Sequence, residues 1–330
     1  MTRAPVDTIV LVTARLVAAL LVLAALPGAA ACRDNPAPPV ANAPVADAAP
    51  RSTAEAAPEG VEPGQLPRKQ GSLRFAIIGD TGRGDRHQFE TAAKMTEWRQ
   101  WFDYSFVLML GDNIYAEGSK EDYEQRFERP YKALLDAGVT FHAAIGNHDP
   151  VGQEHYPLFN MNGRRYYTFE KEEGFLPVLK HKVLFMALDT VNLTRQQVRW
   201  ADAQLEESDA GWKIAYYHHP LYTSGRYQFW ASRLRSTLEP IFTKHKVAVA
   251  LSGHEHFYER TTPQKGVQYF TSGAGGALRL NDLRNSGWTA AGFDTDTHFM
   301  LMEISGDTLY FLAISRKGEI IDWGTVRKPD

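Results

Sequence analysis

The sequence predicts an α/β fold with at least one mixed β-sheet, and two observations lead to that prediction. From residue 73 onward, short apolar runs alternate with helical segments. Several of these runs lack the apolar–polar alternation of a strand with one solvated face, so both faces of the predicted sheet should be covered. The composition agrees, because 44% of the 330 residues are hydrophobic and 23% are charged, which is an ordinary globular mixture.

The predicted strands are the short apolar runs. In chain order they cover residues 73–79, 105–111, 140–146, 183–189, 213–219, 247–253, 268–272, 299–304 and 308–314. Helical segments separate several of the earlier runs, which is typical of parallel strands. The region 299–326 has strand following strand, which is typical of antiparallel pairing.

Three segments carry the periodicity of helices. Ser119 and Thr194 are predicted N-caps, each followed three residues later by a side chain of capping-box type, Asp122 and Gln197. The apolar positions that define the three helices are Tyr123, Phe127 and Tyr131; Val198, Ala201 and Leu205; Leu234, Leu238 and Phe242.

The first 31 residues resemble an export signal. Residues 16–26 form an unbroken apolar run that is too short to span a bilayer as a mature helix. Small residues then lead to Cys32, the only cysteine, as in a bacterial lipoprotein signal whose cysteine is acylated after cleavage. Ala29 is a departure, because such signals usually carry leucine there. A secretory signal cleaved after Ala31 and a transmembrane anchor remain alternatives.

The segment that follows has the composition of a tether. Residues 33–70 contain 8 Pro, 9 Ala and no aromatic residue, so this stretch cannot bury enough surface to offset its ordering entropy. We therefore expect a disordered Pro/Ala-rich tether over residues 32–72 and a single folded domain over residues 73–330. The expected location is the periplasm or the cell surface, with membrane attachment through lipidated Cys32.

The charge balance excludes one class of function. Lys and Arg number 36 and Asp and Glu number 39, which gives a formal net charge of −3. A protein that binds nucleic acid through a broad basic surface would carry a clear positive excess. No nucleic-acid surface is therefore expected.

Polar residues of the metal-binding kind follow the ends of five predicted strands. These five blocks are Asp80; Gly111-Asp112; Gly146-Asn147-His148-Asp149; His218-His219; and Gly253-His254-Glu255-His256. In open α/β sheets the carboxyl ends of the strands face one crevice, so we expect these side chains to converge. The glycines leave room for a sharp turn and for a ligand close to the backbone.

The types of side chain in these blocks point to metal binding. Carboxylates and imidazoles without cysteine suit ions such as Fe, Mn and Zn. One aspartate can bridge two ions, and two ions roughly 3.5–4 Å apart lower the pKa of a bound water and neutralise phosphoryl oxygens. Taken singly, Asp80 is compatible with a helix N-cap and Asp112 with an ordinary turn residue. The five blocks in combination favour a metal site.

The same blocks, in the same order, resemble the metal-binding motifs of the calcineurin-like metallophosphoesterases. The first block continues as Asp-Thr-Gly where many members have Asp-x-His, and the second continues to Tyr115. Both details are similar to the purple acid phosphatase branch, and residues 75–276 resemble its single-domain, tartrate-resistant type. This resemblance implies a sandwich of two mixed β-sheets flanked by helices.

The resemblance also implies a ligand for each position of a binuclear metal centre. The first ion, expected to be Fe³⁺, would be held by Asp80, Asp112, Tyr115 and His256. Its hard anionic donors agree with a ferric ion. The second ion, expected to be Fe²⁺, Zn²⁺ or Mn²⁺, would share Asp112 and add the ligands Asn147, His218 and His254. His219 is then expected to lie outside the ligand set.

His148 is the expected catalytic residue, facing the phosphate and either steadying the transition state or protonating the leaving alcohol. Asp149 is expected to fix the orientation of its ring. Animal members carry a further histidine in the loop that here covers residues 223–228 and contains none. Arg226 and Tyr227 are the two candidates to replace it.

The function expected from this reading is hydrolysis of small phosphate monoesters by a metal-activated hydroxide at a binuclear centre. Two alternatives remain open. One is a phosphodiesterase or nucleotidase that uses the same centre, since substrate choice would lie in loops 113–125, 150–168 and 222–232. The other is a non-catalytic, surface-anchored binding lipoprotein, for which missing ligands would be the signature.

Overall fold

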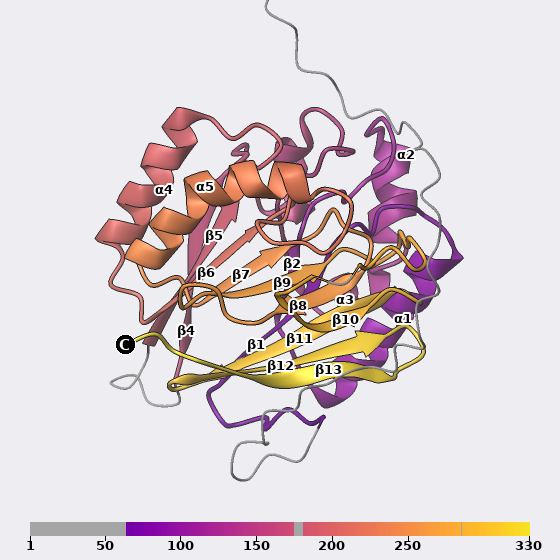
Figure 1. Ribbon diagram of the computed structural model, residues 1–330. Helices are drawn as coiled ribbons and strands as arrows, with labels where there is room; N and C mark the ends of the chain where they lie inside the picture. The colour runs from indigo at the N-terminus through magenta and orange to yellow at the C-terminus, as the bar shows by residue number, and fades with distance from the viewer. Residues whose placement is uncertain (1–63, 175–180, 285) are drawn as a thin grey trace, which may run out of the picture. The chain divides into compact units, whose positions relative to one another are not determined.

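A computed structural model describes residues 64–174, 181–284 and 286–330 of the protein (Figure 1). The predicted signal segment, Cys32 and residues 32–63 of the predicted tether lie outside the described residues. None of the helices in the described part of the chain is both long enough and apolar enough to cross a bilayer.

The secondary structure alternates between strands and helices before ending in strands alone. In chain order the helices and strands are β1 (Leu73–Ile78), α1 (Arg86–Trp101), β2 (Phe106–Met109), α2 (Lys120–Tyr123), the π-helix η1 (Glu124–Glu128), α3 (Lys132–Asp136), β3 (Thr140–Ala143), the short 3₁₀ turns η2 (Gln153–His155) and η3 (Pro157–Phe159), β4 (Tyr167–Glu173), β5 (His181–Leu188), α4 (Arg195–Glu207), β6 (Trp212–Tyr217), α5 (Gln228–Lys244), β7 (Val249–Ser252), β8 (Tyr258–Thr261), β9 (Gln268–Ser272), β10 (Thr289–Phe293), β11 (His298–Ser305), β12 (Thr308–Ser315) and β13 (Ile320–Arg327).

The strands form two mixed sheets. The first has the order β13-β12-β11-β1-β2-β3 and the second the order β10-β8-β9-β7-β6-β5-β4. In the first sheet β1, β2 and β3 are parallel, whereas β11, β12 and β13 pair antiparallel. In the second sheet β5, β6, β7 and β9 are parallel. The predicted mixed α/β fold is confirmed.

The main core lies between the two sheets and is rich in aromatic rings. Phe75 of β1 and Phe106 of β2 stack with their centroids 5.2 Å apart, and both meet Phe185 of β5 edge-on at 5.3 Å. All three rings are fully buried. Burying a ring of this size stabilises a fold by roughly 1.5–3 kcal/mol, and edge-to-face pairs add to that. These contacts fix the two sheets against each other.

Helices cover the outer faces of the sandwich, with α4 and α5 on one side and α1, α2 and α3 on the other (Figure 1). Leu205 of α4 and Phe242 of α5 belong to a second apolar cluster, together with Met186 of β5. The main core includes Met95 of α1 and Leu134 of α3. Because both faces of each parallel strand set are covered, those strands carry the continuous apolar runs seen in the sequence.

The predicted helix caps are present, but one predicted helix is broken. Ser119 and Asp122 form a reciprocal capping box at the start of α2, and Thr194 Oγ1 accepts the Gln197 backbone N–H at the start of α4. The chain after α2 continues as the π-helix η1 and resumes α-helical geometry only in α3. Pro130 separates the two, since proline has no N–H to donate and clashes with the preceding turn.

Several elements have no predicted counterpart, and their sequences explain why. Helix α1 buries Gln88 and Thr91 alongside its few apolar residues, so its apolar periodicity is weak. Strand β4 is the edge of the second sheet and carries the charged run Glu170–Glu173. Edge strands tolerate charge, and charge masks the apolar pattern of a strand.

The packed part of the chain begins earlier than the predicted boundary at residue 73. Leu66 is 3% exposed and lies in the main core. The backbone N–H groups of Arg68 and Lys69 donate to the Glu303 carboxylate at 2.8 and 2.6 Å. Residues 64–72, which the composition assigned to the tether, therefore belong to the folded body. A single apolar side chain among proline and glycine gives a weak signal for such packing.

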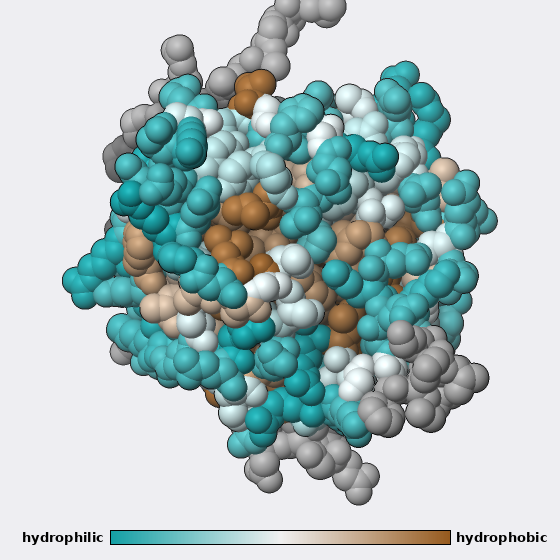
Figure 2. Space-filling model, turned by 180° about the vertical axis from the view of Figure 1, so that it is seen from behind, coloured by the Kyte–Doolittle hydropathy of each residue, from teal (hydrophilic) through white to brown (hydrophobic). Residues whose placement is uncertain are grey.

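The surface seen from behind is largely hydrophilic. Apolar residues appear mainly in a central hollow between hydrophilic side chains (Figure 2). A few large apolar side chains elsewhere are exposed, among them Phe229 and Trp230 at the start of α5.

Candidate metal centre

The two sheets bring five strand ends to one place. The backbone N–H of His254 donates to Asp80 Oδ2 at 2.8 Å, which joins the loops after β7 and β1 across the two sheets. The backbone N–H of His148 donates to Asp112 Oδ1 at 2.8 Å, which joins the loops after β3 and β2. The fifth segment follows β6, where His218 lies 3.4 Å from the same Asp112 oxygen through Nε2.

One part of the site consists of two aspartates, a tyrosine and a histidine. Asp80 Oδ1 lies 3.3 Å from the Tyr115 hydroxyl and 3.3 Å from His256 Nε2. Tyr115 and His256 are themselves 3.3 Å apart between the same two atoms. Asp80, Asp112 and His256 each offer a ligand atom within 4.8 Å of the others. This spacing allows them to bind one ion.

The neighbouring part is rich in imidazoles. His218 Nε2 lies 3.0 Å from Asn147 Oδ1 and 3.2 Å from His254 Nδ1. His218, His219 and His254 offer ligand atoms within 4.8 Å of one another. His219 was expected to lie outside the ligand set, but the structure brings it into this cluster. Its Nδ1 also lies 3.3 Å from Thr190 Oγ1.

The donor atoms fit a metal because too few protons are available to satisfy them. His218 Nδ1 donates its proton to the Leu110 carbonyl at 2.9 Å, so Nε2 carries the lone pair in the neutral ring. That lone pair faces two oxygens, from Asn147 and Asp112, and one nitrogen, from His254. Asp112 Oδ2 is buried with no hydrogen-bond partner in the part of the chain that the structure describes. While His218 is neutral these clustered acceptors have no donor among them, and a cation, either a proton or a metal ion, would satisfy them.

The pKa values of His218 and Asp112 depend on each other. Burial lowers the pKa of His218, but the carboxylates of Asp112 and Asp80 outweigh burial and raise it to about 9. Burial raises the pKa of Asp112, yet His218 holds it below its ordinary value. A proton on His218 can therefore occupy the place of a metal, and metal binding would release it.

Two other titratable side chains of the candidate centre, His254 and Tyr115, are neutral in the protein. Burial and neighbouring imidazoles hold the pKa of His254 well below its ordinary value, so this ring stays neutral with a lone pair available. Burial, Asp80 and Asp112 raise the pKa of Tyr115 well above its ordinary value. Only a strong Lewis acid would ionise that phenol at neutral pH.

The backbone at the strand ends is strained. Asp80, Asp112 and His254 have φ of 55°, 51° and 69°, in the left-handed region that side-chain-bearing residues rarely adopt. Such a residue costs about 1 kcal/mol or more, and strained backbone of this kind gathers at functional sites. Close packing demands glycine beside these residues, since a Cβ on Gly146 would lie 2.1 Å from Asp112 N and 2.2 Å from its Oδ1.

His148 lies at the open side of the site. Its side chain is exposed, and its ring centroid is 5.1 Å from that of Tyr115. Asp149 does not hold the His148 ring as expected. It accepts backbone N–H bonds from Asn113 at 2.6 Å and Gly146 at 2.7 Å, and so ties two ligand loops together. Because Asp149 directly follows His148 in the sequence, the His148 ring had been the expected partner of its carboxylate.

The loop that lacks the additional histidine is wrapped around Glu255. Thr223 Oγ1 and the Tyr227 backbone N–H donate to Glu255 Oε1 at 3.0 and 3.1 Å. Arg226 points elsewhere and forms an ion pair with Asp282 at 2.9 Å. The centroid of the Tyr227 ring instead lies 4.4 Å from the centroid of the His254 ring. Of the two candidates, Tyr227 is the one beside the metal cluster.

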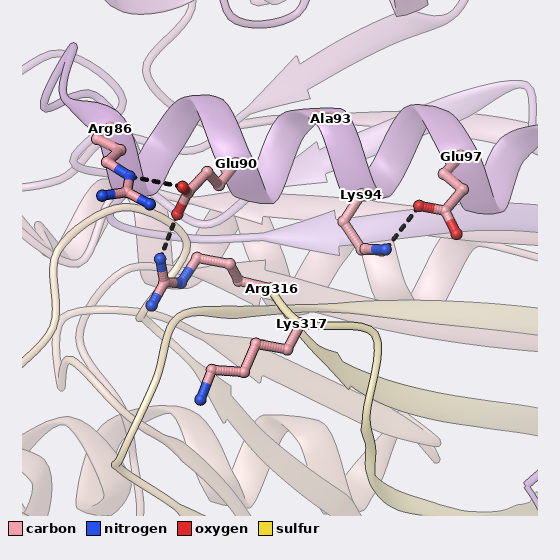
Figure 3. A pocket seen from close by; sticks show the side chains of 7 residues that line it. All are labelled: Arg86, Glu90, Ala93, Lys94, Glu97, Arg316 and Lys317. Atoms are coloured by element: carbon pink, nitrogen blue, oxygen red, sulfur yellow. Dashed lines mark hydrogen bonds and ion pairs between the residues drawn. The ribbon is translucent and has the colours of Figure 1, made fainter.

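A hollow elsewhere on the molecule is not part of this site. It has a volume of 520 Å³ and lies between α1 and the turn after β12, and none of the metal-binding candidates lines it (Figure 3). Glu90 pairs with Arg86 at 2.6 Å and also with Arg316, while Lys94 pairs with Glu97 at 2.6 Å. These paired charges offer no reactive group.

Comparison with known proteins agrees with this geometry. Residues 73–258 match the calcineurin-like phosphoesterase family, and this range ends just after the last histidine of the cluster. The chain belongs to the calcineurin-like phosphoesterase family. This match, together with the acid phosphatase relatives described next, shows that the protein is a metal-dependent phosphoric ester hydrolase.

Within the calcineurin-like family the similarity lies with the purple acid phosphatase branch. Purple acid phosphatase 17 of Arabidopsis thaliana is 26% identical over 244 residues, which is 66% of this chain and 72% of the relative. Tartrate-resistant acid phosphatase type 5 of Oryctolagus cuniculus is 25% identical over 64% of this chain and 76% of the relative. The predicted resemblance to this branch is confirmed.

Solved structures show the same fold. The purple acid phosphatase PPD1 of Lupinus luteus has a TM-score of 0.62 at 19% identity, covering 80% of this chain and 55% of that one. GAP50, described as the anchor in the inner membrane complex of Plasmodium, has a TM-score of 0.69 at 19% identity, covering 79% of this chain and 90% of that one.

Proposed function

We propose that the protein hydrolyses phosphate monoesters at a binuclear metal centre, as an acid phosphatase-like enzyme. Asp80, Asp112, Tyr115 and His256 would hold the first ion. Asp112, Asn147, His218 and His254 would hold the second. Two bound ions would supply an acidified water and neutralise the charge on the phosphoryl group.

Asp112 and His148 have different roles in the proposed reaction. Asp112 provides two carboxylate oxygens, one near His218 and one without a partner, which suits a bridging ligand. His148 is exposed beside the metal cluster, where its imidazole can donate a hydrogen bond to the phosphate or a proton to the leaving alcohol. The Asp112 carboxylate fixes the His148 backbone by accepting its N–H.

The chemistry of the donors also favours different metals in the two positions. Asp80, Asp112 and a phenol make a hard, anionic set that suits Fe³⁺. The amide of Asn147 and the imidazoles suit a divalent ion such as Fe²⁺, Zn²⁺ or Mn²⁺.

The single observation that carries this proposal is the convergence at His218 Nε2. A lone pair there faces Asn147 Oδ1 at 3.0 Å, His254 Nδ1 at 3.2 Å and Asp112 Oδ1 at 3.4 Å. When His218 is neutral, such a set of acceptors is stabilised by a cation, and the ligand types present suit a metal ion in place of the proton. The complete ligand set also disfavours a non-catalytic binding lipoprotein.

The proposal is tested with Asp112→Asn, which keeps the shape of the side chain but removes its charge. We expect the metal content to fall from two ions and the turnover of p-nitrophenyl phosphate to fall at least about a thousandfold. Asp122→Asn is the matched control, because Asp122 caps α2 away from the metal cluster. Full turnover by a well-folded Asp112→Asn protein would contradict the proposal.

The choice between ester classes needs a second measurement. Bis(p-nitrophenyl) phosphate carries the same leaving group as the monoester but one negative charge fewer. We expect kcat/KM to be higher for the monoester. The reverse order would favour the phosphodiesterase or nucleotidase alternative at the same centre.

We also propose that the protein is exported and held at a bacterial membrane through lipidated Cys32. The apolar run at 16–26 and the small residues before the only cysteine support this proposal. Cys32→Ser should move the protein from the membrane fraction to the soluble fraction after cell fractionation. An unchanged distribution would contradict lipid attachment.

A further inference from the structure

A half-buried arginine lies beside the metal cluster without an acidic partner. The Arg279 guanidinium donates to the His254 carbonyl through Nη1 at 3.4 Å, and its carbon lies 5.7 Å from the centre of the Tyr227 ring. Among the described residues no carboxylate forms an ion pair with it. The buried carboxylate of Glu255 interacts with Arg279 only over a longer range. Its Oε1 accepts hydrogen bonds from Thr223 and the Tyr227 backbone, and its Oε2 has no hydrogen-bond partner within the described ranges.

The position of this arginine is fixed relative to the metal ligands. Its backbone N–H donates to the His256 carbonyl at 3.2 Å, and its side chain donates to the His254 carbonyl. Upstream, the backbone N–H of Ala277 donates to the Asp80 carbonyl at 2.9 Å. The segment 277–279 is therefore tied to both sheets at the metal cluster. A charge held in this way acts on whatever binds there.

Arg226, in the loop 223–228, differs from Arg279 because it has an acidic partner. Arg226 also lies close to Tyr227 in the sequence, but it is neutralised by Asp282 in a two-nitrogen ion pair, with its Nε 3.0 Å from Oδ2 and its Nη2 2.9 Å from Oδ1. Arg83, beside Tyr115, pairs with Asp85 at 3.5 Å. Arg279 is thus the arginine beside the candidate metal centre that forms no ion pair with a carboxylate of the described residues, unlike Arg226 and Arg83.

We propose that Arg279 binds a second anionic group of the substrate, so that the preferred substrates carry a second phosphate besides the one that is hydrolysed. This inference rests on the proposed phosphatase function and narrows its substrate class. A guanidinium presents donors in a fork that matches phosphate geometry, and charge-assisted hydrogen bonds of this kind are among the strong ones. A partly desolvated guanidinium gains most from such a partner because it has lost part of its hydration.

The test compares matched pairs of substrates that differ by one phosphate. ADP is set against AMP, and fructose 1,6-bisphosphate against fructose 6-phosphate, with phosphate release followed for the metal-loaded enzyme. We expect the wild type to have a lower KM for the doubly phosphorylated member in at least one pair. Arg279→Gln should raise that KM about tenfold more than it raises the KM of the singly phosphorylated member.

Two further variants distinguish binding of a second anion from a general structural effect. Arg279→Lys retains the charge and should keep part of the preference, whereas Arg226→Gln should leave the ratio of the two KM values unchanged. A preference that persists in Arg279→Gln, or a wild type that shows none in either pair, would overturn the inference while leaving the phosphatase assignment intact. A wild type that hydrolyses no member of either pair and no p-nitrophenyl phosphate would overturn both.

Discussion

At the scale of single residues, the site is built from groups whose charge states depend on one another. Asp112 and His218 stabilise each other's charged forms, and burial together with two carboxylates keeps Tyr115 neutral by raising its pKa. The motifs allowed most of these residues to be predicted, because each follows a strand end. They did not reveal that Asp149 bonds to the backbone of Asn113 and Gly146, since a hydrogen-bond partner far along the chain leaves no local signal.

Tyr115→Phe tests the assignment of a ferric ion to the first position. We expect the oxidised wild type to show a broad visible absorption band from phenolate bound to Fe³⁺, and the variant to lack it because no phenolate remains. The measurement is the visible spectrum with iron content determined in parallel. A band that survives in an iron-loaded variant would exclude Tyr115 as its source.

His142 predicts a dependence of stability on pH that is separate from the metal cluster. Its ring stacks on Phe169 at 4.0 Å, neither ring nitrogen has a hydrogen-bond partner, and burial followed by repulsion from Lys171 lowers its pKa to about 4. The unfolded chain takes up this proton at a pKa of about 6.5. The free energy of unfolding should therefore fall as the pH drops from about 6.5 towards 4.

The measurement compares His142→Phe with the wild type by chemical unfolding at pH 7 and pH 5. Phenylalanine fills the same stacked position and does not titrate, so the variant should lose about 1–2 kcal/mol less stability between the two pH values. Equal losses in the two proteins would show that His142 does not carry the effect.

At the scale of elements, the turns after the strands carry the candidate site residues, and the strands hold these turns in place. Most strands were predicted from their apolar runs, and the loops after β1, β2, β3, β6 and β7 were predicted to converge. The edge strand β4 and the helix α1 were not, because charge or polar burial masks their pattern. The break between α2 and α3 at Pro130 shows how one residue overrides an otherwise regular four-residue repeat.

Gly146→Ala tests the packing between two of these turns. The added methyl group would lie 2.1 Å from the Asp112 nitrogen, so the loop after β2 must shift and carry Asp112 with it. We expect loss of bound metal and a decrease in turnover of about a hundredfold or more. Gly287→Ala is the control, because nothing lies within 4 Å of its new methyl group. Unchanged metal content in Gly146→Ala would contradict this account.

At the scale of the whole molecule, the two sheets are joined by the aromatic core and again at the candidate metal centre, where His254 bonds to Asp80. The sandwich of mixed sheets was predicted from the family resemblance, whereas the pairing of β1 between β2 and β11 was not. That pairing joins Leu73 to Ile304, and no local pattern reports a partner so distant. Packing of residues 64–72 against Glu303 was missed for the same reason.

Removal of metal tests how far the cluster stabilises the fold. Without cations, the buried carboxylates of Asp80 and Asp112 repel each other, and only a proton on His218 compensates. A ligand present at a hundred times its Kd adds about 2.7 kcal/mol, so a chelator should lower the Tm by about 5–10 °C. Asp112→Asn should respond much less to the chelator. An equal response in both proteins would place the metal elsewhere.

The hydrogen bond from His254 to Asp80 spans 174 residues, and its consequence concerns synthesis on the ribosome. A nascent chain that has reached only the fourth motif lacks His254, so its bond to Asp80 cannot form and the candidate metal centre is incomplete. Because β1 pairs with the nearby β2 but also with the distant β11, the first strand of the fold completes its pairing only late in synthesis. Catalytic competence therefore arrives all at once, near the end of translation, rather than growing with the chain.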